Sequence, residues 1–459
     1  MRKNWPAIAL CVLVLGACVK DDIMPPQDDS REQVNPSEPG TPDDPGTTDE
    51  PADTTDIPRE RVGRMPRVTI TVDPSEFDAL CWWDKDTYIS GSVTFDDPDG
   101  WYSDSTSLSV GFRMKGRGNT SWSMSDKKPF RLKLDSKHRV FGMKGNKDWV
   151  LIANYSDKSL LRNTLGYKVS KICGLAWTPK VRACDVTING QDYGSYILVQ
   201  HKEVAGEKVD IKPSEGDYYI EVETSGNDYR IPKLGTPIIF KDPTLSEMGS
   251  ARENYIRGYL NEWGAAVVAD NFGKVYEMMD IDSFVNFFIV EELAKNIDGN
   301  FRKSTFMTKV EGQKLVLYHI WDFDIAFGNC NYMHTEFPPD SKDIYGNDPE
   351  GWFVKVVDER KKSSGLYQHL FKDPTFVARV KARWQEVYPA LCELPSWLET
   401  EASVNRDSYD RNFRIWTILG SYVWPNPSPI PSDYDGELAF LKNFLSVRLE
   451  WMDGEISKW

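Results

Sequence analysis

Alternating apolar and polar residues mark the chain between residues 67 and 134. Three stretches before residue 117, VTITV, YISGSVTF and SLSVGFRMKG, alternate with a period of two, and Asp, Gly and Pro residues separate them. A fourth stretch, Lys127–Leu134, places three apolar side chains on one face and two basic ones, Arg131 and Lys133, on the other. This alternation predicts a β-rich amino-terminal region.

The pattern becomes helical in the run WVLIANYSDKSLLRN, which begins at Trp149. Ser156 or Asp157 is suited to cap a helix over residues 159–172, and Gly174 is suited to end it. The sequence therefore predicts one helix after the first group of strands.

Two further strand patterns, VRACDVTING and QDYGSYILVQHKEV, meet at Asn189-Gly190, a dipeptide that favours a two-residue hairpin turn. Gln200 and Glu203 follow the second of these strands. Residues 207–245 contain more strand patterns, which we interpret as a strand-rich insertion.

Helical patterns dominate the rest of the chain. Amphipathic helices are predicted over Ser250–Asp270, over Asp282–Asn296 and within residues 366–459, where the Pro-rich run WPNPSPIPSD interrupts them. Residues 329–365 are polar and loop-like, which suits a lid or a substrate surface. The second half is thus expected to be mainly helical.

Three aspartates, Asp298, Asp322 and Asp324, flank a predicted strand at Leu315–Ile320. Carboxylates that come close repel one another, so one of them must protonate or bind a cation. A divalent metal is the simplest solution, and Mg²⁺ is usually held by one or two carboxylates together with substrate phosphates. Solvated aspartates beside a core strand, or a structural Ca²⁺ site, are the alternatives.

The order of these aspartates is the one that protein kinases use. There a catalytic-loop Asp precedes a β-hairpin and a metal-binding Asp follows it, and here Gly328 closes the second motif. The loop GRGNTSW, which contains Arg117 and Asn119, has glycines, an amide and hydroxyls that can face a phosphate, although a plain hairpin loop fits as well. The basic residues of the next strand would then neutralise phosphates, or simply form its solvent-facing side.

Composition and charge limit the class of protein. The 459 residues include 16 Trp, 20 Tyr and 21 Phe, enough for a large core, and the net charge of −15 argues against a nucleic-acid partner. Residues 19–66 are rich in Pro, Asp, Thr, Glu and Gly, so they are predicted to form a disordered stalk. The folded part is expected to begin near residue 67.

The first 18 residues resemble a lipoprotein signal peptide. A basic start and a short apolar run lead to Leu-Gly-Ala-Cys, which resembles the bacterial lipobox, so we expect lipidation at Cys18. An ordinary signal peptide with a chance Cys is the alternative. Lys20 and the two acidic residues after it resemble the export signal of Bacteroidota surface lipoproteins, which predicts a surface-exposed outer-membrane protein held by this lipid anchor.

Five cysteines follow the signal peptide, an odd number without any CxxC spacing, which argues against a zinc site. Cys173 and Cys184 have two open interpretations, a disulfide in an oxidising compartment or buried free thiols.

Four blocks of sequence resemble the spore coat protein H (CotH) family of atypical, secreted kinase-like proteins. They are WDFDIAFG at 321–328, RGNTSW at 117–122, KKPFRLKL at 127–134 and WVLIANYSDKSLLRN at 149–163. The blocks occur in the order of the family, and the resemblance extends from about residue 67 to the carboxy terminus.

The resemblance implies an α+β fold of the two-lobed, atypical protein-kinase-like type over residues 67–459. The β-rich amino-terminal lobe, with its insertion, would span 67–245, and the mainly helical carboxy-terminal lobe would span 246–459. The activity implied is ATP- and Mg²⁺-dependent phosphoryl transfer to Ser or Thr of a secreted or surface protein.

Site residues follow from the same resemblance, position by position. Asp298 matches the catalytic-loop aspartate, and Asp322 and Asp324 match the pair of which one or both hold metal. A basic residue would steady the phosphates beside the Asn119 loop, and two polar residues would lie near a nucleotide-contacting hinge. These candidates are Arg117, Lys128, Arg131 and Lys133 for the phosphates, and Gln200 and Glu203 for the hinge.

One departure from kinases weakens the case for catalysis. The Asn that often supplies a second metal ligand aligns with Ser304, and Asn300 is the expected substitute. The rival interpretation is therefore an inactive kinase-like surface protein that binds a glycan or a protein through aromatic loop residues such as Trp352 or Trp424.

Overall fold

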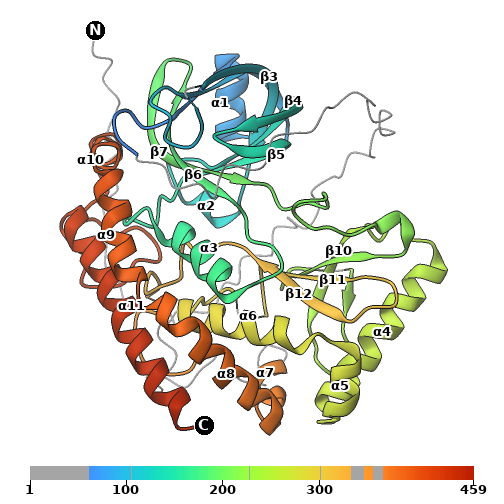
Figure 1. The fold of residues 1–459 in the computed structure, drawn as a ribbon. Coiled ribbons are helices and arrows are strands. Elements are labelled where there is room, and N and C mark those ends of the chain that lie inside the picture. Colours follow the sequence, from blue (N-terminus) through green and yellow to red (C-terminus); the bar gives the residue numbers. More distant parts are fainter. Residues whose placement is uncertain (1–60, 105, 227, 300, 332–345, 355–364) are drawn as a thin grey trace, which may run out of the picture.

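Seven strands of the amino-terminal part form a closed barrel (Figure 1). The computed structural model describes residues 61–459 except 105, 227, 300, 332–345 and 355–364. Neighbouring strands pair antiparallel in the order β1-β2-β3-β4-β5-β7-β6, and the parallel pair β1–β6 closes the barrel. The strands are β1 (Arg67–Val72), β2 (Ile89–Asp97), β3 (Thr106–Gly116), β4 (Phe130–Val140), β5 (Met143–Ile152), β6 (Val181–Ile188) and β7 (Gln191–Gln200).

The predicted alternation is confirmed inside this barrel. Phe130, Leu132 and Leu134 of β4 are buried in the barrel core, whereas Arg131 and Lys133 are half-buried on the other face. Two short helices, α1 (Pro74–Trp82) and α2 (Thr120–Ser123), lie in the connections β1–β2 and β3–β4. The glycine-containing loop therefore includes a helical turn.

Residues 149–163 differ from the prediction, because they contain the end of a strand as well as the start of a helix. Residues Trp149 to Ile152 form the end of β5, and the helix α3 begins only at Arg162 (Arg162–Cys173). Its end at Gly174, with a left-handed φ of 73°, is confirmed. The strand was missed because a short apolar run suits a buried strand and a helix equally well.

The expected capping of α3 was also only partly right. Leu161 is the N-cap residue and gives no side-chain cap. Instead, Asp157, five residues before the helix start, accepts a hydrogen bond of 2.8 Å from the backbone N–H of Arg162. Asp157 thus supplies an oxygen to the first turn from outside the usual cap position.

The hairpin at Asn189-Gly190 is confirmed: it joins β6 to β7, and both residues have positive φ angles, 50° and 78°. The strands after residue 207 lie elsewhere. They are β8 (Tyr218–Val222), β9 (Tyr229–Arg230) and β10 (Pro237–Asp242), and they form one sheet with β11 (Thr305–Lys309) and β12 (Leu315–Ile320) in the order β12-β11-β8-β10-β9. Strands expected as an insertion of the barrel region therefore pair with the hairpin that precedes the acidic residues.

The carboxy-terminal region is mainly helical, as predicted, and the whole described chain is a mixed α+β structure. Its central helix, α6 (Ile281–Ala294), packs against α3, α8 and β12, and it is buried over most of its length (Figure 1). The other helices are α4 (Ser250–Val268), α5 (Phe272–Met278), α7 (Leu366–Leu370), α8 (Pro374–Leu391), α9 (Leu394–Val404), α10 (Arg406–Ile415) and α11 (Tyr434–Ser457).

One late helix packs on the barrel. α10 lies against β7, and its Asn412 Oδ1 accepts hydrogen bonds from Lys127 Nζ (2.9 Å) and from the backbone N–H of Ser195 (3.2 Å). Ser408 of the same helix donates a hydrogen bond to the buried Asp185 of β6, and Arg411 forms an ion pair with it. Polar side chains of α10 thus provide hydrogen-bond and ion-pair partners for buried groups of the barrel region.

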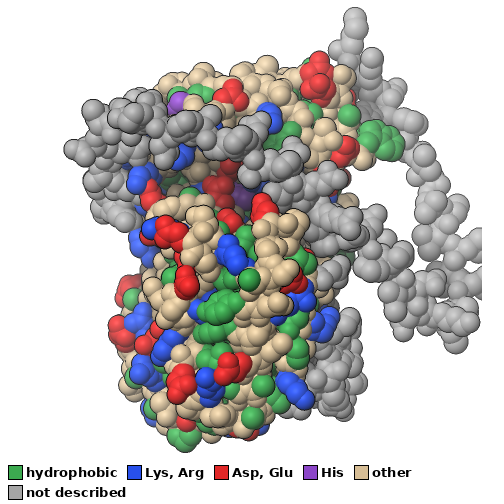
Figure 2. Space-filling model, turned by 90° about the vertical axis from the view of Figure 1, so that its right-hand side faces the viewer, with side chains coloured by type: hydrophobic (Ala, Val, Ile, Leu, Met, Phe, Trp, Pro, Cys, Tyr) green, Lys and Arg blue, Asp and Glu red, His purple; other side chains and the backbone are tan. Residues whose placement is uncertain are grey.

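Several sequence-level questions are settled for the described residues. The five cysteines after residue 18, including the buried Cys173 and Cys184, are free thiols. Within the described chain, no helix has the length and apolar character to cross a membrane. Acidic and basic side chains are interspersed over the lower part of the face in Figure 2. Cys18, the predicted signal peptide and residues 19–60 lie outside the described residues.

Candidate functional site

A pocket opens where the β3–β4 connection, the segment after β5 and the segment after β12 meet. It encloses about 330 Å³, part of it open to solvent. Two of the predicted metal ligands and one predicted phosphate contact line it, together with residues that we had not assigned to it. The lining residues are Arg117, Ser121, Ser125, Lys127, Pro129, Ile152, Ala153, Asn154, Tyr155, Ser156, Asp322 and Asp324.

The carboxylates come from residues 322–324, which we call the acidic turn and which follow β12 after the single residue Trp321. Asp322 has a φ of 75°, a left-handed conformation that costs a non-glycine residue about 1–3 kcal/mol and occurs preferentially at functional sites. Between the two aspartates, the buried Phe323 ring packs on α3 at Gly166, where a Cβ would lie only 2.3 Å from the ring. Glycine at this position therefore lets α3 approach the acidic turn closely.

Three buried asparagines from different segments hold the backbone of the acidic turn. Asn163 Oδ1 accepts the N–H of Phe323 at 2.9 Å. Asn296 Nδ2 donates to the carbonyl of the first aspartate at 3.2 Å, and Asn329 Nδ2 donates to the carbonyl of the second at 2.7 Å. All three are at most 2% exposed. Because one backbone group of each of three consecutive residues is bound, the strained turn is fixed before any ligand arrives.

The two carboxylates are electrostatically unfavourable together. The pKa of Asp324 is raised to about 8, because burial and the nearby Asp322 and Asp298 disfavour its charged form, whereas Arg117 favours it. Without a cation, Asp324 is therefore mostly protonated at neutral pH. A divalent ion would compete with that proton.

Two basic residues of the β3–β4 connection line the same pocket as this acidic pair. Arg117 lies over the Trp321 ring, 5.4 Å from its centroid, which leaves the guanidinium at the pocket wall. Lys127 is fully buried, and its ammonium donates to the carbonyls of Ala153 (2.9 Å) and Ser195 and to a side chain of α10. Burial lowers the pKa of Lys127 to about 7.

Asp298 lies beside this pocket rather than in its lining. It follows α6, its side chain is 35% exposed, and it lies 3.8 Å from Arg302 Nη1 and 3.6 Å from Lys303 Nζ. Among the described residues, the carboxylates of Asp298, Asp322 and Asp324 do not all lie close enough together to bind one metal ion. Its effect on the pKa of Asp324 shows that it is nevertheless near. Asp298 is thus an accessible carboxylate outside the pocket lining, whereas Asp322 and Asp324 are a pair within it.

The other predicted phosphate contacts bond elsewhere. Asn119 is exposed and accepts a hydrogen bond from Lys85 at 3.2 Å. Lys128 donates to the carbonyl of Trp122, and Arg131 pairs with Asp148 at 2.9 Å. None of these three predicted residues, and neither Lys133 nor the hinge candidates, belongs to the pocket lining given above.

The two hinge candidates also have structural partners. Gln200 is buried, and its Oε1 accepts the backbone N–H of Lys180 at 3.1 Å. Glu203 forms an ion pair of 2.6 Å with Lys208. Their predicted contacts with a nucleotide stay predictions.

The donor set of the pocket fits a hard divalent cation. The two aspartates supply carboxylate oxygens, the ligands that Mg²⁺ prefers, and the raised pKa of Asp324 indicates a site short of positive charge. The expected additional ligand, Asn300, lies outside the described residues. Ser304 precedes β11, and its carbonyl accepts the N–H of Trp321 at 3.1 Å.

The aromatic candidates for glycan binding differ in accessibility. Trp352 is partly buried and packs against Trp451 and Trp459, with ring centroids 4.9 and 5.0 Å apart. Trp424 is 37% exposed. Trp352 therefore belongs to an aromatic cluster at the end of α11, and only Trp424 presents its ring to solvent to a substantial extent.

Sequence reasoning missed several residues of this site. Lys127 was noted on its strand but not assigned to the pocket, and Asn154, Asn163 and Asn329 were not assigned to it at all. Asn154 Oδ1 accepts a hydrogen bond of 3.0 Å from Asn163 Nδ2. The only available signal was that Asn163 lies in the block WVLIANYSDKSLLRN, which resembles the family.

The fold and the pocket together describe an α+β protein with a preformed acidic turn suited to a cation and an arginine beside it. The family model described as "CotH kinase protein" matches residues 113–452. The chain belongs to this family and is a kinase-like protein, for which nucleotide and metal use is implied in general. A search of the curated proteins found no match.

Proposed function

We propose that the protein is an atypical kinase that transfers the γ-phosphoryl group of ATP, with Mg²⁺, to Ser or Thr of a protein outside the cytoplasm. The observation that carries the proposal is the acidic turn: two carboxylates share a pocket with Arg117, and three buried asparagines hold them in place. The family supports a kinase-like activity of this kind.

The residues divide the work by position. Asp322 and Asp324 would hold Mg²⁺, which offsets the charge of the phosphates when bound. Arg117 at the pocket wall pairs with a phosphate oxygen, and Asp298, the accessible carboxylate, orients the acceptor hydroxyl and takes its proton. Lys127 has its ammonium bonded to the protein, so it supports the pocket wall instead of contacting phosphate.

The two-lobed arrangement of kinases, with the barrel as one lobe and the helical region as the other, is part of the same proposal. So is the place of action: lipidation at Cys18 would anchor the protein in the outer membrane, with its folded part outside the cell and a surface or secreted protein as substrate. The motif at residues 15–22 supports this localisation.

Calorimetry of the purified protein with ATP and Mg²⁺ tests the proposal. We expect Mg²⁺-dependent ATP binding that is lost in an Asp322→Ala/Asp324→Ala variant. Asp298→Ala should keep the binding and lose phosphoryl transfer, because its carboxylate lies outside the pair. Asp282→Ala, which removes an exposed carboxylate of α6, is the control and should match the wild type.

If the folded wild type binds no ATP, the kinase proposal is wrong. The rival function, a non-catalytic module for glycans or proteins, would then be tested by binding to a glycan array. In that case Trp424→Ala should reduce binding, since this ring is exposed, while loss of the paired aspartates should leave binding unchanged.

A further inference from the structure

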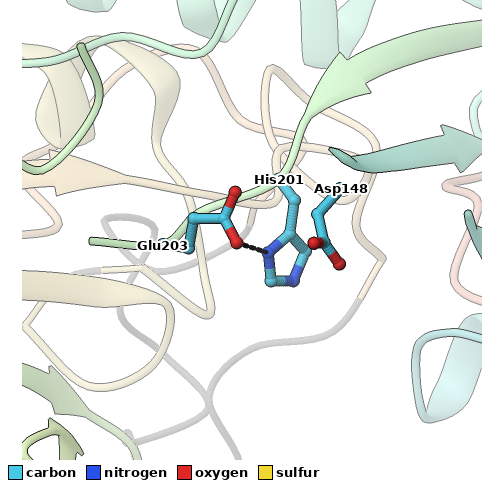
Figure 3. Close-up of side chains that lie close together, drawn as sticks. All are labelled: Asp148, His201 and Glu203. Atoms are coloured by element: carbon cyan, nitrogen blue, oxygen red, sulfur yellow. Dashed lines mark ion pairs between the residues drawn. The ribbon is translucent and has the colours of Figure 1, made fainter. Parts of the chain in front are cut away.

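A second group of side chains with metal-binding atoms lies outside the pocket. Asp148 lies within β5, and His201 and Glu203 come from the segment that leaves β7 (Figure 3). One ligand atom from each residue lies within 4.8 Å of the others. Among the described residues this is the only group of three such side chains.

Each of the three residues has a ligand atom that its neighbours do not use. Both hydrogen bonds from Arg131 go to Asp148 Oδ1, at 3.1 and 2.9 Å, and Lys208 bonds to Glu203 Oε1 at 2.6 Å. The second oxygen of each carboxylate has no hydrogen bond to the described residues. His201 Nδ1 is buried without a hydrogen-bond partner among them and lies 4.0 Å from Glu203 Oε2.

We propose that Asp148, His201 and Glu203 bind a transition-metal ion of the Zn²⁺ class. An imidazole nitrogen with two carboxylate oxygens suits Zn²⁺, whereas Mg²⁺ prefers oxygen ligands alone. Water can complete the coordination, because the side chains of His201 and Glu203 are 15% and 29% exposed. The ion pairs with Arg131 and Lys208 orient the carboxylates in the way that outer partners orient metal ligands.

Binding requires a small movement. With metal–ligand distances near 2.1 Å, tetrahedral ligand atoms lie about 3.4 Å apart, so the three atoms must approach one another by roughly 1 Å. Glu203 is the most exposed of the three and lies in a segment outside the strands, so we expect it to move. The ion would then link β5 of the barrel to the segment that leads to the second sheet.

Neighbouring positive charge makes a specific prediction about affinity. Lys208 shares Glu203 with the ion and repels it, so Lys208→Met should tighten Zn²⁺ binding by about three- to tenfold. His201→Asn should weaken it by at least about tenfold, because a ligand is lost. The two changes act in opposite directions, which a general loss of structure would not produce.

The test is titration of the full-length protein in detergent with Zn²⁺ in excess Mg²⁺, followed by calorimetry. We expect one Zn²⁺ per chain, with His138→Asn, which changes a half-buried histidine of β4, as the unchanged control. Absence of saturable Zn²⁺ binding, or equal binding by the wild type and His201→Asn, would overturn the proposal. If His201→Asn does not fold, Glu203→Gln replaces it with the same two outcomes.

This inference does not rest on the proposed kinase function. The Asp322→Ala/Asp324→Ala variant removes the carboxylate pair of the pocket and should keep Zn²⁺ binding. Loss of Zn²⁺ binding in that folded variant would show that the ion binds at the acidic turn, which would also contradict the site proposed here.

Discussion

Replacement of Asn163 by alanine tests whether the acidic turn is held in place before ligands bind. Asn163 is fully buried, and its amide serves the N–H of Phe323 and the side-chain oxygen of Asn154. Leaving one buried polar group without a partner costs about 1–3 kcal/mol. Because two groups lose their partner and a small cavity forms, we expect the free energy of unfolding to fall by about 2–4 kcal/mol.

The same change should also weaken the binding of metal and nucleotide, although Asn163 does not itself line the pocket. Without the bond to Phe323, the left-handed Asp322 can relax, and the two carboxylates lose their relative position. We expect the affinity for Mg²⁺ with ATP to fall at least about tenfold, equivalent to about 1.4 kcal/mol. Calorimetry measures the affinity, and urea denaturation measures the stability.

Asn405→Ala is the matched control. Asn405 is also buried, at 1% exposure, but it bonds to the carbonyl of Glu401 between α9 and α10. It should lose stability and keep its ligand affinity. If Asn163→Ala is destabilised yet binds Mg²⁺ and ATP as tightly as the wild type, the asparagine contacts support only the fold, and the argument for preorganisation is refuted.

Three further predictions concern charge. Mg²⁺ affinity should rise about tenfold per pH unit up to about pH 8 and then level off, because the proton on Asp324 must leave before its carboxylate binds metal. Calorimetry between pH 6 and 9 measures this dependence, and an affinity that does not change with pH would contradict it. Arg117→Met should weaken ATP binding and move the pH dependence of Mg²⁺ affinity to higher pH, since the guanidinium lowers the pKa of Asp324. Arg113→Met, which changes an exposed residue of β3, is the control and should have neither effect. Arg162→Met should lower the free energy of unfolding, measured by urea denaturation, by about 3–5 kcal/mol, because it leaves the fully buried Asp157 without its ion-pair partner. Adding Asp157→Asn to this variant should restore part of the lost stability.

Local patterns predicted the strands and most helices, but not their assembly. Alternation placed Phe130 inside the barrel, and Asn189-Gly190 fixed a hairpin, because both signals depend on neighbouring residues alone. The parallel pairing of β1 with β6 joins residues more than 100 positions apart, and no local pattern reports such contacts. For the same reason, strands β8 to β10 were expected beside the barrel although they form one sheet with β11 and β12.

The candidate site was predictable where charge and family resemblance coincided. Asp322, Asp324 and Arg117 lie in blocks that resemble the family, and all three line the pocket. Lys128 and Arg131 were equally reasonable phosphate contacts by sequence, since a strand pattern shows which face a residue occupies but not which partner it finds. Asn163 and Asn329 were missed because a neutral amide gives no signal until the backbone group it binds is known.

The contact between α10 and the barrel has a consequence for how the protein is made. Lys127 and Asp185 are buried in the barrel region, yet their partners Asn412 and Arg411 lie in α10, near the end of the chain. During synthesis the barrel strands emerge long before α10, so Asp185 then lacks both of its partners from that helix and Lys127 lacks one of its three. We therefore expect the nascent barrel to acquire stable structure only after nearly the whole polypeptide has been released, which makes its folding a late and cooperative event.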